Sequence, residues 1–158
     1  MRKILLPVKY QRQFNAVVSV LALQNISSLY AVFKNISGLL TDNGIFLFVI
    51  NHPAFRIPKA SSWGWLGKDV QYRIVEKYMS ELKKPITAHP GEQDSAITWS
   101  FHRPLQQYFK AMHANKLTTL ELEEWVSPKM SEPGQRAFAE NRARNEFPLF
   151  MTIVAKKI

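Results

Sequence analysis

The sequence predicts an α/β fold in which a parallel strand, helix and strand unit is followed by a C-terminal antiparallel hairpin. Two apolar runs, residues 16–23 and 45–50, consist largely of β-branched, aliphatic and aromatic residues. Such runs are typical of strands that are covered on both faces, as in parallel sheets. Residues 28–40, which lie between the runs, have a helical pattern, and a connection of this length allows a right-handed crossover.

The helix over residues 28–40 is predicted from its two ends and from its middle. Ser27 or Ser28 can cap the first turn, because a side-chain oxygen accepts a hydrogen bond from a free backbone N–H. Asn43 and Gly44 are expected to end the helix, because glycine tolerates the left-handed conformation that closes a helix. Apolar residues recur between these ends at three- and four-residue spacing and form one buried stripe: Leu29, Val32, Phe33, Ile36, Leu39 and Leu40.

The rest of the chain alternates predicted strands, helices and loops. Strands are expected at residues 16–21, 44–50, 96–101, 118–126 and 149–155, and further helices at 105–115 and 137–144. The last two strands would form the closing antiparallel hairpin. Residues 1–13 are predicted to be an N-terminal arm or an irregular edge strand. Pro7 restricts such a strand to the edge or the end of a sheet. Residues 83–95 hold two prolines and a glycine and are expected to form a loop.

Two stretches fit more than one structure. Residues 70–82 fit a helix by the spacing of their apolar residues and a strand by their alternation. Residues 61–65 are expected to form an aromatic loop with Gly64 as a hinge between Trp63 and Trp65. That loop is either a lid that covers a substrate or a pair of rings that pack on the core.

Composition favours a single globular domain over residues 1–158. Hydrophobic residues make up 46% of the chain and charged residues 21%, which is ordinary for a globular protein. No apolar run approaches the length that spans a bilayer. The chain has no cysteine, which excludes disulfides and thiolate metal sites and favours the reducing cytoplasm. No His, Asp and Glu cluster has metal-ligand spacing either.

The net charge of +9 raises nucleic acid as an alternative partner, because a basic protein attracts anions in general. The basic residues are spread along the chain, without a long block of lysine and arginine. This distribution favours a solvated basic surface over a nucleic-acid interface.

Four segments carry a resemblance to a known family. They are residues 14–19, in which Phe14-Asn15 introduces the first strand, residues 23–26 after that strand, residues 39–48 from the helix end into the second strand, and Phe101-His102-Arg103-Pro104-Leu105, an aromatic-His-Arg step into a helix. In order and spacing they resemble the second half of a class I S-adenosylmethionine-dependent methyltransferase of the type 11 group. The resemblance covers most of residues 14–157. It implies a partial Rossmann-like methyltransferase sheet, a small-molecule methyl acceptor, S-adenosylmethionine as cofactor, and an extended segment at 72–78 that pairs with 96–102.

The resemblance also implies what the chain lacks. The family's cofactor site lies largely before the strand at Ala16, in a Gly-rich turn and in an acidic residue that binds the ribose hydroxyls. No glycine precedes Gly38, so the first strands of the sheet, the turn and the acid are expected to be absent. The chain is therefore expected to be a C-terminal portion of the fold, as a fragment, a chain with a misplaced start or one part of a split enzyme. By itself it is expected to bind the cofactor weakly.

Candidate acceptor-binding residues lie after or beside the carboxyl ends of predicted strands, where open α/β sheets bind ligands. Asn51, His52 and Phe55 follow the second strand in a proline-rich turn. Aromatic residues that can enclose a methyl acceptor are Tyr72, Trp99 and Phe101. We expect Asn51, His52, Phe55, Tyr72, Trp99 and His102 to converge near one cleft.

His52 and His102 are the candidate bases for an O- or N-acceptor. The alternatives are a surface histidine on a structural turn for His52 and a strand-end histidine bonded to the backbone for His102. The family resemblance, rather than any spacing, implies that the cofactor is bordered by Leu21, Ala22, Leu23 and Gln24.

Two functions are compatible with these features. The chain is either the distal half of a small-molecule methyltransferase, active with its missing half, or a non-catalytic remnant or binding module that keeps the substrate side of the fold. In both cases the strand at 16–21 has an open edge, and Val17, Val18 and Val20 are expected to be partly bare. That edge is expected to pair with residues 3–8, with a second copy or with an N-terminal half.

Overall fold

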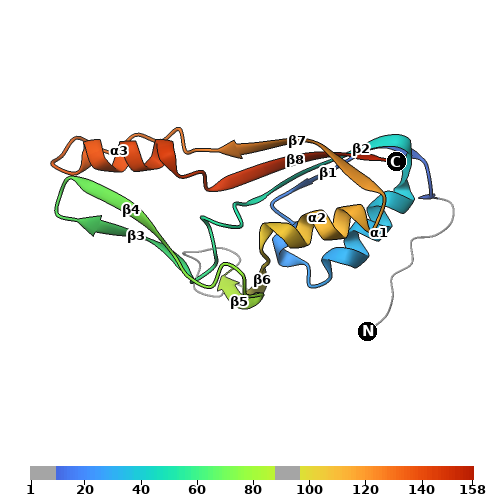
Figure 1. Ribbon diagram of the computed structural model, residues 1–158, viewed down its shortest axis with the longest axis horizontal. Coiled ribbons are helices and arrows are strands. Elements are labelled where there is room, and N and C mark those ends of the chain that lie inside the picture. The colour runs from blue at the N-terminus through green and yellow to red at the C-terminus, as the bar shows by residue number, and fades with distance from the viewer. Residues whose placement is uncertain (1–9, 88–96) are drawn as a thin grey trace.

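The computed structural model describes residues 10–87 and 97–158 and contains a four-stranded mixed sheet (Figure 1). Strand β1 pairs in parallel with β2, whereas β2 with β8 and β8 with β7 are antiparallel. These pairings confirm the predicted parallel unit and the C-terminal hairpin. In the order of the sheet the strands are β1 (Phe14–Val20), β2 (Leu40–Asn51), β8 (Phe150–Lys157) and β7 (Leu117–Trp125).

The crossover between β1 and β2 contains helix α1 (Leu29–Leu39). Ser28 caps it, because its Oγ accepts from the Ala31 N–H at 3.3 Å. The helix ends at Leu39, before the turn at Asn43 and Gly44 that was expected to end it. Asn43 adopts the left-handed conformation, with φ of 62°, and β2 already begins at Leu40. Gly44 is needed for space, since a Cβ there would lie 2.9 Å from the carbonyl oxygen of Thr41.

One face of the sheet is covered by α1 and by helix α2 (Leu105–His113), which lie side by side beneath the strands in Figure 1. Phe33 of α1 meets Phe46 and Phe48 of β2 at ring-centroid distances of 5.6 and 5.7 Å. All three side chains are fully buried. This aromatic cluster is the centre of the core and holds the crossover against the sheet.

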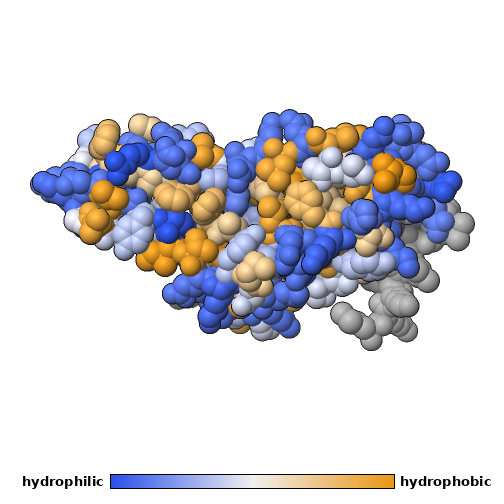
Figure 2. Space-filling model, viewed as in Figure 1, coloured by the Kyte–Doolittle hydropathy of each residue, from blue (hydrophilic) through white to orange (hydrophobic). Residues whose placement is uncertain are grey.

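The other end of the elongated molecule is a lobe formed by the hairpin of β3 (Ser61–Leu66) and β4 (Val70–Val75) with helix α3 (Ala137–Glu146) beside it (Figure 1). In Figure 2, apolar side chains gather on the surface at this end. Phe138 and Leu66 are 77% and 70% exposed. A second hairpin, β5 (Leu82–Thr87) with β6 (Ile97–His102), connects the lobe to α2.

Three expectations about these hairpins are wrong. Residues 61–65 are not a loop but strand β3. The segment at 72–78 does not pair with 96–102, because β4 pairs with β3 and β5 takes the place beside β6. The expected loop at 83–95 begins as strand β5. For residues 70–82, the strand alternative holds over Val70–Val75.

Strand β1 lies at the edge of the sheet, as expected. Val18 and Val20 are 62% and 61% exposed, and Val17 is half-buried against the core. The expected pairing of residues 3–8 with this edge lies outside the described residues, as does most of the expected arm. Across residues 10–87 and 97–158, no helix has the length and apolar composition that crossing a membrane requires.

Candidate functional site

A narrow polar cleft lies where β1, β2 and β6 end. Short helix η2 (Leu23–Asn25), which follows β1, brings Gln24 to it, and Asn51 ends β2. The space that the cleft encloses is about 10 Å³, the size of about one water molecule. The residues around it are Gln24, Asn51, Pro53, Arg56, Pro58, Ser100, Phe101, His102, Arg103 and Tyr108.

Arg103 is the most deeply placed charge in this cleft. It is 5% exposed, and its Nη2 donates to the carbonyl oxygens of Ile26 and Ser27 at 2.6 and 2.8 Å. Its guanidinium carbon lies 5.3 Å from the centre of the Phe101 ring. The side chain thus fastens the turn before α2 to the turn before α1. Among the residues that the structure describes, its Nη1 has no hydrogen-bond partner.

Gln24 has an unpaired acceptor atom, the counterpart of the unpaired donor Nη1 of Arg103. Its Nε2 donates to the carbonyl oxygen of Leu21 at 2.7 Å, which identifies the other side-chain atom as the oxygen. Leu21 has a left-handed φ of 51°, so the chain turns sharply here at the end of β1. The buried Oε1 of Gln24 meets no hydrogen-bond donor within the described parts of the chain.

His102 lies on the same cleft, at the end of β6. Its Nε2 donates to the carbonyl oxygen of Tyr78 at 2.8 Å, which leaves Nδ1 as the side of the ring with the free electron pair. Burial lowers the pKa of His102, and the neighbouring Arg103 lowers it further, against the effect of the Tyr78 carbonyl. The ring is therefore neutral near pH 7. Burial also raises the pKa of Tyr108, which Arg103 opposes.

His52 has a different environment. It is 4% exposed, and its Nδ1 accepts from the backbone N–H groups of Ala54 and Phe55 at 3.1 and 3.2 Å. Its Nε2 therefore carries the proton, which it donates to Glu124 Oε1 at 2.6 Å. Both ring nitrogens therefore bind protein groups: Nδ1 binds within the turn after β2, and Nε2 joins this turn to strand β7.

The structure brings three of the predicted site residues, Asn51, Phe101 and His102, to the cleft. The other three acceptor-binding candidates are not among the described residues that line the cleft. Phe55 packs on the His52 ring at 4.8 Å, Tyr72 lies over Gly64 in the lobe hairpin, and Trp99 lies beneath Lys83 at 4.2 Å. Of the four residues expected to border the cofactor, Leu23 is buried in the core and Gln24 lines the cleft, whereas Leu21 and Ala22 are exposed.

Sequence reasoning missed Arg103, Arg56 and Tyr108 as residues of the cleft. The sequence does contain one signal for Arg103. This charged residue lies between aromatic residues and the proline that starts a helix, a position that gives no reason to expect a side chain facing solvent. Its partners Ile26 and Ser27 are 77 and 76 residues away in the chain. Spacing alone does not reveal such a contact.

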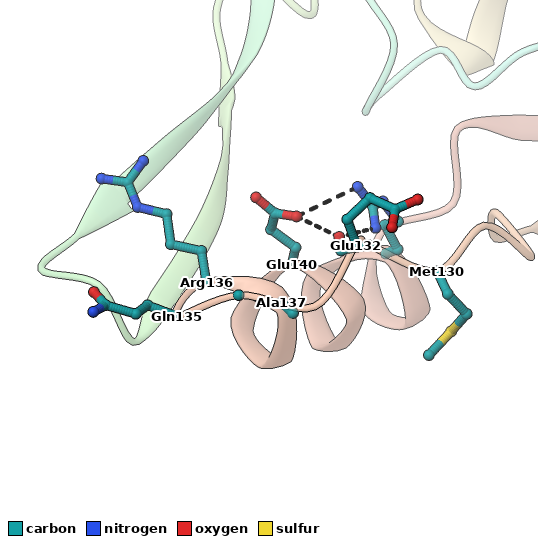
Figure 3. A pocket seen from close by; sticks show the side chains of 9 residues that line it. Met130, Glu132, Gln135, Arg136, Ala137 and Glu140 are labelled. Atoms are coloured by element: carbon teal, nitrogen blue, oxygen red, sulfur yellow. Dashed lines mark hydrogen bonds and ion pairs between the residues drawn. The ribbon is translucent and has the colours of Figure 1, made fainter.

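A wider cleft at the start of α3 is less suited to bind a ligand (Figure 3). Three of its polar residues bind one another, because Ser131 bonds both Glu140 and Arg144, and Glu140 pairs with Arg144. Gln135 and Arg136 point away from Glu140 in Figure 3. A third cleft lies between α1 and α2, where Arg103 is the only deeply buried charged residue of the described lining. Within the described ranges, no group of acidic, His and Cys residues is arranged to hold a metal ion.

No family model matches the sequence, and no curated protein matches it significantly. Solved structures do match. An S-adenosylmethionine-dependent methyltransferase from Mesorhizobium loti is 19% identical with a TM-score of 0.68, over 93% of this chain and 63% of its own. A Listeria monocytogenes protein assigned to the same class is 21% identical with a TM-score of 0.68, over 94% of this chain and 63% of its own.

A third structure, an S-adenosylmethionine-dependent methyltransferase from Clostridium acetobutylicum, is 17% identical with a TM-score of 0.53, over 92% of this chain and 59% of its own. The chain therefore spans less than two thirds of the length of each of these proteins. At these identities the similarity establishes the fold, which is that of S-adenosylmethionine-dependent methyltransferases.

Proposed function

We propose that this chain is the acceptor-side part of an S-adenosylmethionine-dependent methyltransferase that acts on a small molecule. The observation that carries the proposal is the polar cleft at the carboxyl ends of β1 and β2 in a chain with the methyltransferase fold. Open α/β sheets bind ligands at that edge. The three similar structures are longer than this chain, so the activity is proposed for the whole fold, including the part that this chain does not span.

In this proposal Leu21, Ala22, Leu23 and Gln24 border the cofactor. The sharp turn at Leu21 and the orphan oxygen of Gln24 fit one side of such a site. No glycine precedes Gly38, so the residues present do not provide the Gly-rich turn that would hold the rest. When bound, S-adenosylmethionine supplies a methyl group that its sulfonium already activates.

The remaining work of the protein is to orient the acceptor, to exclude water and to take its proton. Of the two candidate bases, His102 is the better placed, because its Nδ1 is free of the Tyr78 bond and the ring lies on the cleft. Both nitrogens of His52 bind protein groups, which favours a structural role. Asn51 and Phe101 would contact the acceptor in the cleft, and Phe55, Tyr72 and Trp99 would contact one that extends beyond it.

A partner that completes the sheet is part of the proposal. The outer edge of β1 is open, and its exposed valines, Val18 and Val20, are apolar. An apolar edge of this kind is a template for another strand. A polypeptide that supplies the first strands and the Gly-rich turn would cover the edge and complete the cofactor site. The alternative function is a non-catalytic binding module that keeps the substrate side of the fold.

The test compares the 158-residue chain alone with the same chain co-expressed with the polypeptide encoded directly upstream. Calorimetry with S-adenosylhomocysteine should give no micromolar binding for the chain alone and clear binding for the pair. The pair should transfer a radiolabelled methyl group to small acceptors, and His102→Gln should lower kcat by roughly 10²–10⁴-fold. Micromolar binding by the chain alone would contradict the missing-half interpretation. Cofactor binding by the pair without transfer to any acceptor would favour the binding module.

A further inference from the structure

The four-stranded sheet has a second face that no helix of the described chain covers. Helix α1 packs on the side of the sheet that carries Phe46 and Phe48, and Figure 1 shows α2 on that same side. Side chains alternate between the two faces along a strand, so Leu47 points to the other side. Val18 lies opposite Leu47 on the neighbouring strand, and its side chain is 62% exposed. The sheet therefore has one covered face and one open face.

The open face is apolar on three strands and acidic on the fourth. Directly opposed residues share a face, which gives three rows in the order β1, β2, β8 and β7. These rows are Ala16, Ile45, Lys156 and Thr118; then Val18, Leu47, Val154 and Glu121; then Val20, Val49, Thr152 and Glu123. Apart from Lys156 at one end, the charges of this face are the carboxylates of β7.

The type of sheet indicates what covers such a face. Strands that are apolar at successive positions, as β1 and β2 are, belong to sheets with helices on both faces. Helix α1 belongs to one of these two layers. The three similar structures are matched over 63%, 63% and 59% of their lengths, so more than a third of each lies outside the match. A helix of that remaining part of the fold is the cover that the sheet calls for.

The dimensions of the face fit one helix with a basic flank. A helix is about 10–12 Å wide and strands are about 4.8 Å apart, so a helix over β2 spans β1 to β8 and its flank reaches β7. Glu121 and Glu123 are about 7 Å apart along β7, and helix positions i and i+4 are about 6 Å apart. Neither carboxylate is in an ion pair with another described residue, although Glu123 accepts a hydrogen bond from Trp125.

We propose that the open face binds an amphipathic helix from the part of the fold that this chain does not span. The apolar stripe of that helix lies on Val18, Val20, Leu47 and Val154, and two of its lysine or arginine residues, four positions apart, pair with the carboxylates of β7. The proposal goes beyond the catalytic assignment, because the helix docks here whether or not the assembly transfers methyl groups.

Two designed peptides of about 18 residues, long enough to be helical, are the probes. Both have the same leucine stripe, and one flank carries two lysines in the first peptide and two glutamates in the second. Methyl NMR of the 158-residue chain should show shifts of Leu47 and Val154, with the lysine peptide bound about 3- to 10-fold more tightly. The chain carries a net charge of +9, so non-specific attraction predicts the opposite order. Tighter binding of the glutamate peptide, equal affinities, or no binding would overturn the proposal.

Matched variants locate the helix on the face. Val20→Lys puts a charge into the apolar part and should weaken both peptides at least about 10-fold, whereas Leu66→Lys makes the same kind of change in the lobe and should not. These side chains are 61% and 70% exposed, so neither change should unfold the chain. Glu121→Lys should abolish the preference for the lysine peptide, and Glu146→Lys, an equal charge change on exposed α3, should keep it. A preference that survives Glu121→Lys would overturn the basic flank.

Other occupants of the face give different results. Shifts of Leu47 and Val154 that depend on the concentration of the chain alone would assign the face to a second copy and overturn the proposal. An assembly that transfers methyl groups while these two side chains stay open to solvent would also overturn it and leave the methyltransferase function intact. Binding of the lysine peptide with the predicted variant pattern supports the docking site even where no methyl transfer is found.

Discussion

The sheet with α1 and α2 is stabilised differently from the lobe of β3, β4 and α3. In the sheet, whole aromatic rings are removed from water, as Phe33, Phe46 and Phe48 show. In the lobe, α3 buries only two alanines, Ala139 and Ala143, within its own span. The rest of the lobe is held by contacts of rings with rings and guanidinium groups and by hydrogen bonds such as that from Arg142 to the Asp69 carbonyl oxygen. One region therefore has a core of its own, and the other depends on a small number of edge contacts.

Truncating one aromatic ring in each region tests this difference most directly. Phe33→Ala removes the ring at the centre of the aromatic cluster and should lower the free energy of unfolding by about 3–5 kcal/mol. Phe147→Ala removes a half-buried ring that meets Phe55 and Trp63 at 5.6 and 5.7 Å, and should cost about 1–2 kcal/mol. Urea unfolding of both variants measures the difference.

Phe138→Ala is the control for these variants, because that ring is 77% exposed and its loss should leave stability nearly unchanged. Equal losses for Phe33→Ala and Phe147→Ala would show that the lobe contributes to a common core. The comparison between the two regions would then be wrong.

The same difference explains how much of the fold was predictable. Strands β1 and β2 and helix α1 are buried elements, so burial imposed apolar runs and a 3.6-residue stripe that can be recognised in the sequence. The sequence predicts a loop in place of strand β3 because of Gly64. In the structure a Cβ at that position would lie 2.5 Å from the Tyr72 ring, so this glycine makes room for a side chain across the hairpin. A cross-strand neighbour of this kind leaves no periodic signal.

The sequence does not predict strand β5, for a related reason. Its sequence includes Lys83, Lys84 and Pro85, which suggests a loop, yet proline is tolerated in a strand that has a neighbour on only one side. The candidate site was predicted in part: strand ends indicated Asn51, Phe101 and His102, because topology places strand ends together. Arg103 and Gln24 were not recognised as a pair, since their proximity depends on how two distant turns pack.

The two edges of the sheet give the next prediction. Strand β7, at one edge, carries Glu121, Glu123 and Glu124, whereas β1, at the other, has no charged residue. Charges discourage pairing with another strand. The chain should therefore self-associate through β1, and Val18→Lys should shift it to the monomer in size-exclusion chromatography with light scattering.

Leu120→Lys on β7 is the matched control, because Leu120 is 57% exposed on the strand that is already charged. It should leave the association unchanged. A wild-type chain that is monomeric at all concentrations would show that the edge of β1 is covered by residues of the same chain.

His102 sits where the two regions join and should make the stability of the joint depend on pH. Burial lowers its pKa below the ordinary value of about 6.5, so the folded chain binds fewer protons than the unfolded chain between the two values. The contribution of the neutral ring is then complete above about pH 6.5 and is lost as the pH falls below it. Urea midpoints at pH 5.5 and 7.5 should differ less in His102→Gln than in the wild type. His113→Gln, which removes an exposed histidine, should keep the wild-type difference.

The smallest effect should come from the surface contacts of the lobe. The Arg136 guanidinium lies 4.7 Å from the centre of the Trp65 ring, and this contact joins the start of α3 to β3. A cation–π pair at an exposed site contributes about 0.5–1 kcal/mol. The single changes Arg136→Gln and Trp65→Leu also alter packing and charge, so the double-mutant cycle is the proper measurement, because only the coupling energy isolates the pair. A coupling energy of zero would mean that the Arg136–Trp65 pair adds nothing to the attachment of α3, which would then depend on the contact of Phe147 with Trp63 and on the hydrogen bond from Arg142 to the Asp69 carbonyl oxygen.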